Sequence, residues 1–178
     1  MKTYIALLRG INVSGHKIVK MEILRKVLGE LDFENIKTYI QSGNIIFDSD
    51  VKDTGVLENR IAQKIEEHFG FLVPVMVVTR DELKTVVRKN PYPGLEDTTQ
   101  PYVAFLSEVP VAEGITILQQ VDFGGDTFTA IDKTLYLHYS RSAANTKLSN
   151  AAIESKLKVW ATSRNWKTVL KLIELSGK

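Results

Sequence analysis

IKTYIQSGNIIFD, residues 36–48, is the stretch that decides the fold of this chain. The apolar and β-branched runs at 36–40 and 44–48 are typical of two β-strands. Ser42 and Gly43 lie between the runs, where a small polar residue followed by a glycine allows a tight bend. The stretch therefore predicts a β-hairpin in the first half of the sequence.

The segments on either side of the hairpin alternate between strand and helix patterns. Residues 3–9 form an apolar run typical of a strand, and apolar residues recur at helical spacing over 20–33. After the hairpin, 56–69 carries a second helical stripe, and the β-branched run 73–79 predicts another strand. The resulting order, β-α-β-β-α-β, is that of a ferredoxin-like unit.

The second half of the chain repeats most of this order. Its patterns predict a strand at 102–108, a helix at 111–120, a hairpin of strands 126–131 and 134–140, and helical sequence to the end. No strand pattern follows this hairpin. The second unit is therefore predicted to lack its final strand.

These patterns predict an α+β protein built from two fused ferredoxin-like units. The first unit is expected over 1–79 and the second, with basic C-terminal helices, over 101–178. A connecting helix and loop are expected over 80–100, because a short helical pattern there is followed by turn-forming residues.

The composition narrows the chemistry of the chain. Cysteine is absent, which excludes disulfides, thiolate metal sites and thiol nucleophiles, and the three histidines show no metal-binding spacing. We therefore expect no metal and no cofactor. The sequence has no apolar run long enough to span a bilayer and no signal-peptide pattern, so we expect a cytoplasmic protein with no membrane partner.

Charge is distributed unevenly along the chain. Residues 133–178 contain nine Lys/Arg and two Asp/Glu, whereas residues 1–132 contain fourteen and nineteen. A basic segment indicates an anionic partner, although a basic face in water, balanced by the acidic remainder, explains the same pattern. Stacking on nucleic-acid bases would need exposed aromatics, for which only Tyr136, Tyr139 and Trp160 are candidates.

Two polar loops are expected to meet at one end of the first sheet. In a ferredoxin-like unit the first two strands are parallel, so the loop after the first strand lies beside the hairpin bend. Both loops carry hydrogen-bonding side chains, and their glycines let backbone N–H groups approach a ligand. We name these loops the rim; its candidate ligand-binding residues are Arg9, Asn12, Gly15, Lys17, Gln41, Ser42 and Asn44.

The first of these loops has only a partial match to a nucleotide-binding P-loop. Gly10 and Gly15 have the spacing of the motif G-x-x-x-x-G-K-[ST], but His16 takes the lysine position and Ile18 the hydroxyl position. The helix also begins too late for its N-terminal amides to hold the same phosphate. The order of residues therefore argues against a nucleoside triphosphatase.

The segment ATSRNWKTVLKLIEL, residues 161–175, predicts a closing helix with Thr162 or Ser163 as its N-cap and Trp166 in the core. Arg164 would then lie in the first turn, where a cation opposes the helix dipole. Either of two partners would compensate for this unfavourable position: an acceptor within the fold, or a bound anion held by Arg164 and Asn165. These two residues complete the candidate binding set.

Three blocks, LLRGINVSG at 7–15, YIQSGNIIF at 39–47 and TSRNWKTVLKL at 162–172, resemble the uncharacterised bacterial family catalogued as domain of unknown function 1697. The resemblance implies a pair of fused ferredoxin-like units and no established activity. Ser14 departs from the glycine expected in the family pattern. The family's recurrent positions correspond to Arg9, Gly10, Asn12, Gly15, Tyr39, Gln41, Ser42, Gly43, Asn44, Thr162, Arg164, Asn165 and Trp166.

Three functions remain open from the sequence. The first is a binding module for an anionic ligand, nucleic acid or nucleotide, which uses the basic segment and the rim. The second is an enzyme for a small phosphorylated or polar metabolite, with His16 as the available base beside the rim and Arg164 holding the anion. The third is a structural or adaptor protein, whose unpaired sheet edge binds another chain. The sequence leaves the oligomeric state open.

Overall fold

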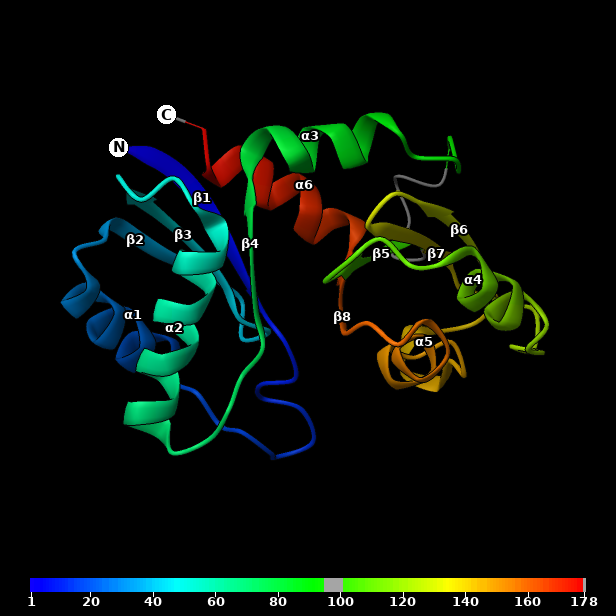
Figure 1. The fold of residues 1–178 in the computed structure, drawn as a ribbon, viewed down its shortest axis with the longest axis horizontal. Helices are drawn as coiled ribbons and strands as arrows, with labels where there is room; N and C mark the ends of the chain where they lie inside the picture. Colours follow the sequence, from blue (N-terminus) through cyan, green and yellow to red (C-terminus); the bar gives the residue numbers. More distant parts are fainter. Residues whose placement is uncertain (95–100, 178) are drawn as a thin grey trace. The chain divides into compact units, whose positions relative to one another are not determined.

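The computed structural model describes residues 1–94 and 101–177 (Figure 1). This part of the chain contains two four-stranded antiparallel sheets and six α-helices. It divides into two compact units, unit 1 with residues 1–84 and 172–178 and unit 2 with residues 85–171. Residues 95–100, within the predicted connecting segment, lie outside the described residues.

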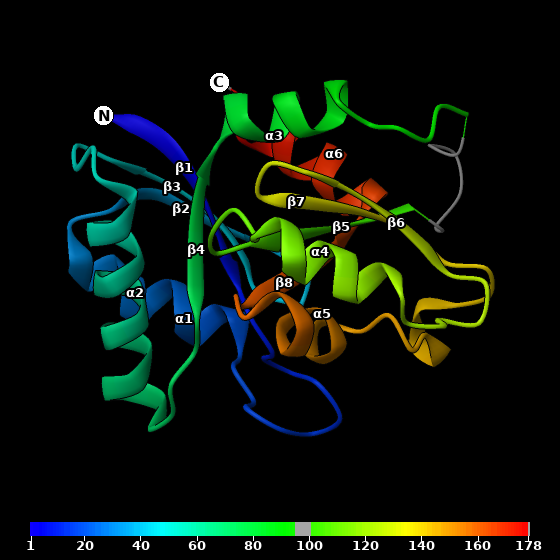
Figure 2. The same cartoon turned by 45° about the vertical axis from the view of Figure 1, so that its right-hand side comes forward.

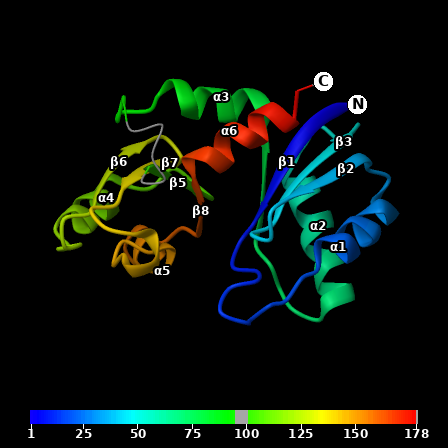
Figure 3. The same ribbon diagram turned by 180° about the vertical axis from the view of Figure 1, so that it is seen from behind.

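Unit 1 forms the predicted order of elements. The strands are β1 (Lys2–Leu8), β2 (Glu34–Tyr39), β3 (Asn44–Ser49) and β4 (Val75–Thr79), arranged β2-β3-β1-β4. Helices α1 (Met21–Leu28) and α2 (Thr54–Phe69) cover one face of this sheet, as Figures 1 and 3 show. Helix α3 (Arg80–Arg88) follows β4 directly.

The core of unit 1 lies between that face of the sheet and the two helices. Alternate residues of β1 and β3 point toward the helices, because side chains in a strand alternate between faces. The stripes of α1 and α2 pack against them. Fully buried members of this core include Tyr4, Leu8, Leu24, Ile45, Phe47, Leu57 and Ile61.

Unit 2 has the same arrangement. Its strands are β5 (Pro101–Leu106), β6 (Thr127–Ile131), β7 (Thr134–His138) and β8 (Ala161–Asn165), arranged β6-β7-β5-β8. Helices α4 (Ala112–Gln119) and α5 (Asn150–Leu157) lie on one face of the sheet (Figure 2). The chain ends in α6 (Trp166–Leu175).

Strand β8 corrects the prediction that the second unit lacks its final strand. Residues 161–165 pair antiparallel with β5, with Tyr102 opposite Asn165 and Leu106 opposite Ala161. The sequence ATSRN carries no apolar alternation, because three of its five residues are polar and one is a cation. Pairing with β5 therefore stabilises this strand, and not its own residue pattern. The edge of β5, which the adaptor hypothesis expected to be unpaired, is occupied by β8.

Helix α6 begins later than predicted. Its first residue is Trp166, and the Asn165 Oδ1 accepts a hydrogen bond from the Thr168 backbone N–H at 2.7 Å. Thr162 and Ser163, the predicted caps, lie in β8 instead. Trp166 is 1% exposed, which confirms its predicted place in the core. In 1–94 and 101–177, no helix is long and apolar enough to cross a membrane.

Candidate functional site

Asn12 ties together the two loops of the rim. Its side-chain amide donates to the carbonyls of Val19 at 2.9 Å and Gln41 at 2.8 Å, and its Oδ1 accepts from the Val19 N–H at 2.8 Å. The backbone N–H of Leu8 also donates to the Gly43 carbonyl at 2.8 Å. The loop after β1 and the β2–β3 bend therefore lie side by side.

The first rim loop has an unusual backbone. Asn12, Ser14, Gly15 and Lys17 have φ angles of 54°, 48°, 79° and 48°. Left-handed conformations cost energy for residues other than glycine, so the Asn12 hydrogen bonds help to hold the loop in this shape. Ser14 also adopts the left-handed conformation. The glycine that the family pattern is expected to have at this position would adopt it at less cost.

Gly43 is the residue that lets the second loop approach the first. Its φ is 80°, and a Cβ at this position would lie 2.6 Å from the Leu8 Cβ and 2.8 Å from the Ile11 Cδ1. Any larger side chain would push the β2–β3 bend away from the β1 loop. The bend predicted from Ser42 and Gly43 thus has a packing reason as well as a conformational one.

The other predicted rim residues differ in exposure and in their contacts. Asn44 is fully buried and donates to the Tyr39 carbonyl at 2.9 Å and to the Ser42 Oγ at 3.1 Å. The Lys17 Nζ donates to the Leu72 carbonyl at 2.6 Å. Gln41, Ser42 and Gly15 are exposed, and Arg9 is half-buried. Asn12 and Asn44 therefore act in the structure as supports of the loops.

Exposed aliphatic side chains surround the rim, a feature that the sequence analysis missed. All of them lie on the loops at one end of the unit 1 sheet. They are Val13 (58% exposed), Ile18 (55%), Ile40 (46%) and Leu72 (65%). The hydrogen bond from Lys17 to Leu72 joins the 70–74 loop to the first rim loop. The rim is therefore a mixed polar and apolar surface.

Arg164 and Asn165 lie in unit 2 and in a different element from the one predicted. Arg164 is in β8, 5% exposed, and its Nη1 donates to the Thr162 Oγ1 and to the Ser163 carbonyl, both at 2.8 Å. Burial lowers the pKa of Arg164 to about 10, because desolvation disfavours the charged form. The helix-dipole argument for Arg164 therefore does not apply, and acceptors within the fold hold its guanidinium.

The aromatic candidates for base stacking are mostly buried. Tyr136 is 2% exposed and Tyr139 5% exposed, and the Tyr136 hydroxyl donates to the Val86 carbonyl at 2.8 Å. Burial raises the pKa of Tyr136 to about 12. Trp160 is half-buried. Neither tyrosine presents a ring on which a base would stack.

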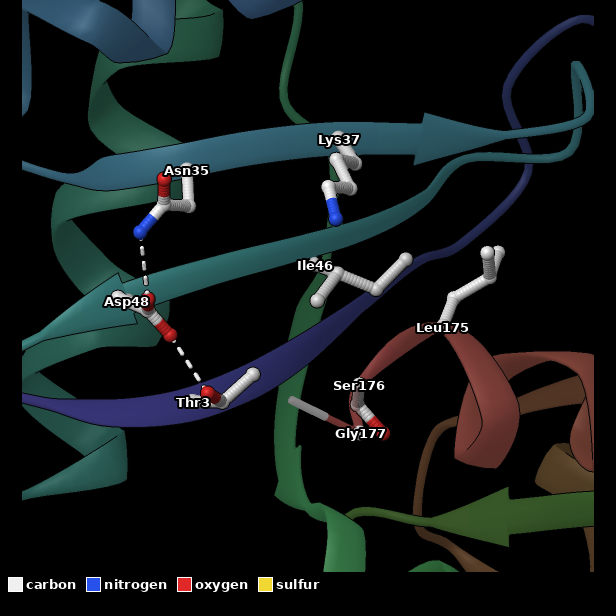
Figure 4. Close-up of a pocket in the computed structure, with 8 residues that line it drawn as sticks. All are labelled: Thr3, Asn35, Lys37, Ile46, Asp48, Leu175, Ser176 and Gly177. Atoms are coloured by element: carbon white, nitrogen blue, oxygen red, sulfur yellow. Dashed lines mark hydrogen bonds between the residues drawn. The ribbon is translucent and has the colours of Figure 1, made fainter.

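A polar cleft of about 340 Å³ opens on unit 1 between the sheet and residues 175–177, at the end of α6 (Figure 4). Its floor is Asp48, a carboxylate on β3 that is 2% exposed and accepts from the Thr3 Oγ1 at 2.6 Å and the Asn35 Nδ2 at 2.8 Å. Asn35 reaches Asp48 from a β-bulge in β2, where its φ is 52°. Lys37 lines the same cleft from β2.

A second cavity, of about 260 Å³, lies in unit 2 between residues 123–126 and 140–147. Asp126 accepts from the Ser140 backbone N–H at 2.7 Å, the Ser140 Oγ at 2.9 Å and the Thr146 Oγ1 at 2.5 Å. Burial by itself raises the pKa of Asp126, but the hydrogen bonds from Thr146 and Ser140 outweigh it and lower the pKa below its ordinary value. We call this three-donor arrangement the Asp126 clasp.

Glycine 125 lets the clasp form. Its φ is 96°, and a Cβ there would lie 3.3 Å from both the Cβ and the Oγ of Ser140. The exposed cations Arg141 and Lys147 line the cavity next to the clasp. The sequence signal for this site was the absence of acidic residues from 133–153, a stretch inside the basic segment.

The structure shows two antiparallel sheets with helices on one face of each, loops that carry hydroxyl, amide and cationic groups, and two small polar hollows. Within the part of the chain that the structure describes, no group of three or more His, Cys, Asp or Glu side chains is arranged to hold a metal. These features define the class: an α+β protein with polar surface sites and no apparent metal centre in its described residues.

The chain belongs to the family described as Protein of unknown function (DUF1697), whose model matches residues 1–136. It is also similar to a conserved bacterial protein from Streptococcus pneumoniae, whose solved structure has a TM-score of 0.70 and 22% sequence identity, with 98% of each chain covered. A likeness at this identity shows the fold alone. No protein with a curated description matches the sequence.

Proposed function

We propose that the protein binds an anionic ligand, a nucleotide or a nucleic acid, through its basic C-terminal segment together with the rim. The observation that carries the proposal is the charge of residues 133–153, which contain three cations and no acidic residue. All three, Lys133, Arg141 and Lys147, are exposed. Exposed cations attract phosphate groups, and the counterions of the phosphates are released on binding.

The rim supports the proposal because it too is positively charged, like the basic segment. Residues 9–20 contain Arg9, Lys17 and Lys20 and no acidic residue, and residues 40–44 contain none either. The bond from Lys17 to the Leu72 carbonyl uses one of the three donors of an ammonium group, so the others can reach an anion. The burial of Tyr136 and Tyr139 favours an electrostatic mode of binding over base stacking.

Fluorescence anisotropy tests this proposal with labelled single-stranded and double-stranded oligonucleotides and a labelled nucleotide, each over a series of salt concentrations. The expected result is binding whose log affinity falls linearly with log salt. Lys156→Gln/Lys167→Gln, which removes two exposed cations of the segment, should weaken oligonucleotide binding and make the slope shallower. Lys26→Gln/Lys52→Gln, on exposed residues outside the segment and the rim, removes the same charge and serves as the matched control.

Arg164→Ala is unsuitable for that experiment. Because Arg164 is 5% exposed and donates to groups of its own strand, its removal tests stability before it tests binding. Absence of binding by the wild-type chain at low salt would contradict the proposal.

The adaptor function is a second candidate, favoured by one observation. Val13, Ile18, Ile40 and Leu72 are each between 46% and 65% exposed on neighbouring loops, and contiguous exposed apolar surface often marks a protein interface. Sedimentation of the wild-type chain and of Ile18→Ser/Leu72→Ser over a range of concentrations tests it. Self-association lost in the double variant would support it, and a monomer at every concentration would argue against a homomeric interface.

We also propose a duplicated ferredoxin-like fold and a cytoplasmic location for the protein. Each sheet with its helices is a ferredoxin-like unit, and the chain is an internal duplication of it; the equal strand orders β2-β3-β1-β4 and β6-β7-β5-β8 support this. A cytoplasmic location fits the absence of cysteine. The small-metabolite enzyme stays a prediction from the sequence.

A further inference from the structure

The cavity beside the Asp126 clasp carries two cations that neither the candidate residues from the sequence nor the family description assigns to a function. Arg141 and Lys147 are exposed and line it from the same segment. Ser142 and Asn145, which also line it, add a hydroxyl and an amide that can donate hydrogen bonds. The cavity therefore combines charge and donors in one hollow of about 260 Å³.

The clasp fixes the segment that carries these groups. Ser140 and Thr146, on either side of Arg141, both donate to Asp126, and the Thr146 Oγ1 also accepts from the Leu148 N–H at 2.9 Å. Asp126 is the one carboxylate among the residues that line the cavity, and its oxygens are engaged by three donors. With Arg141, Lys147 and Asp126, the lining carries one net positive charge, and the three donors hold the carboxylate oxygens in the clasp.

We propose that this cavity binds the phosphate group of a small phosphate monoester, with Arg141 and Lys147 pairing with the anion. This inference rests on the proposed function, anion binding, and names the ligand class and the site. A phosphate monoester carries about −1.5 to −2 charges at pH 7 and can pair with both cations, whereas an internal phosphodiester of a nucleic acid carries one charge.

The size of the cavity points to the same class of ligand. Pockets for drug-sized ligands have volumes of about 300–1,000 Å³, and this cavity lies just below that range. A terminal phosphate with a few further atoms fits such a volume. A phosphodiester has substituents on both sides of its phosphorus and enters a small hollow less readily.

The test is an NMR titration of the full-length ¹⁵N-labelled chain with methyl phosphate, a monoester, and with dimethyl phosphate, the corresponding diester. Methyl phosphate should produce saturable shifts in the amides of 123–126 and 140–147. Arg141→Gln/Lys147→Gln should weaken this binding about tenfold or more, because it removes both charge-assisted partners. Lys26→Gln/Lys52→Gln, on exposed residues outside the cavity, the basic segment and the rim, removes the same charge and should bind as the wild type does.

The outcomes separate this inference from the proposed function. If methyl phosphate shifts no cavity amide while the oligonucleotide or nucleotide still binds, the inference is wrong and the proposed function stands. If no anion binds at low salt, both are wrong. Equal affinity for the diester, or equal weakening in the two double variants, would overturn the monoester site. Both cavity cations are exposed, so the dispersion of the amide spectrum should confirm that the variants fold.

Discussion

Asn12 has a structural role at the centre of the candidate rim. Its three hydrogen bonds to Val19 and Gln41 occupy the amide that the sequence analysis placed among the ligand-binding groups. A polar side chain in a loop can serve the loop or a ligand, and the residue type alone does not distinguish the two roles. Among the candidate binding side chains of the rim, Gln41, Ser42 and Lys17 are exposed.

Gly43→Ala should destabilise the protein through both crowding and backbone strain. The added Cβ would lie 2.6 Å from the Leu8 Cβ at a φ of 80°, so we expect a loss of about 2–4 kcal/mol in the free energy of unfolding. Gly10→Ala is the matched control: its φ is 68°, nothing lies within 4 Å, and strain alone should cost about 1 kcal/mol. Urea unfolding followed by circular dichroism measures both, and equal losses would contradict the packing argument.

Asp126→Asn should remove a pH-dependent contribution to stability. Burial raises the pKa of Asp126, but the hydrogen bonds from Thr146 and Ser140 hold it below its ordinary value in the folded state, so the unfolded chain binds the proton more tightly. The contribution is present above the ordinary pKa of an aspartate and is lost as the pH falls through the folded-state pKa. Urea midpoints of wild type and variant should therefore differ most at pH 7 and converge as the pH falls through the folded-state pKa. A constant difference would refute this account of the clasp.

At the scale of the elements, the sequence predicts most of the fold and fails at one strand. The hairpin at 36–48 and the helix at 56–69 are found as β2, β3 and α2, because their periodicity is strong and local. Strand β8 has no such pattern, since a strand made largely of polar residues is stabilised by its partner β5 and not by its own composition. Because β8 was not predicted, the last helix was predicted to begin too early, and Arg164 was assigned to that helix instead of to β8.

The candidate site was predictable only in part for a similar reason. Topology correctly brought the two rim loops together, because parallel strands place their following loops at one end of the sheet. The unit 2 cavity joins 123–126 to 140–147 across the β6–β7 hairpin through the clasp. Nothing in the local sequence around Asp126 indicates that its oxygens accept from Ser140 and Thr146, so that site required the structure.

Asn165→Ala should weaken the start of α6. The Asn165 Oδ1 accepts from the Thr168 N–H at 2.7 Å, and loss of an N-cap costs about 1 kcal/mol. Asn165→Asp should keep the stability, because an aspartate caps as well as an asparagine. Thermal unfolding compares the two, with Lys167→Ala on the exposed side of the helix as control. An alanine variant as stable as the wild type would show that the cap contributes nothing.

At the scale of the whole molecule, α6 contributes residues to both compact units. Residues 166–171 belong to unit 2, whereas 172–178 belong to unit 1. Leu172 is 1% exposed. The last residues of the chain therefore belong to the compact unit with which the chain begins.

Leu172→Ala should destabilise unit 1 selectively, by about 2–5 kcal/mol, because it leaves a cavity in the packing of a buried leucine. Both tryptophans, Trp160 and Trp166, lie in unit 2, so their fluorescence reports that unit while circular dichroism reports both. The dichroism transition should move to lower urea and the fluorescence transition should stay. A fluorescence transition that moves equally would contradict the selective effect; Leu170→Ala, at 40% exposure, is the control.

The central claim is that the basic segment binds an anionic ligand, and it rests on the excess of Lys and Arg over Asp and Glu in residues 133–178. The most direct measurement is the anisotropy of labelled oligonucleotide and nucleotide with the wild-type chain over a salt series, beside Lys156→Gln/Lys167→Gln. We predict that log affinity falls linearly with log salt and that the double variant binds the oligonucleotide more weakly, with a shallower slope. No binding at low salt, or binding that is independent of salt and of the two lysines, would contradict the claim.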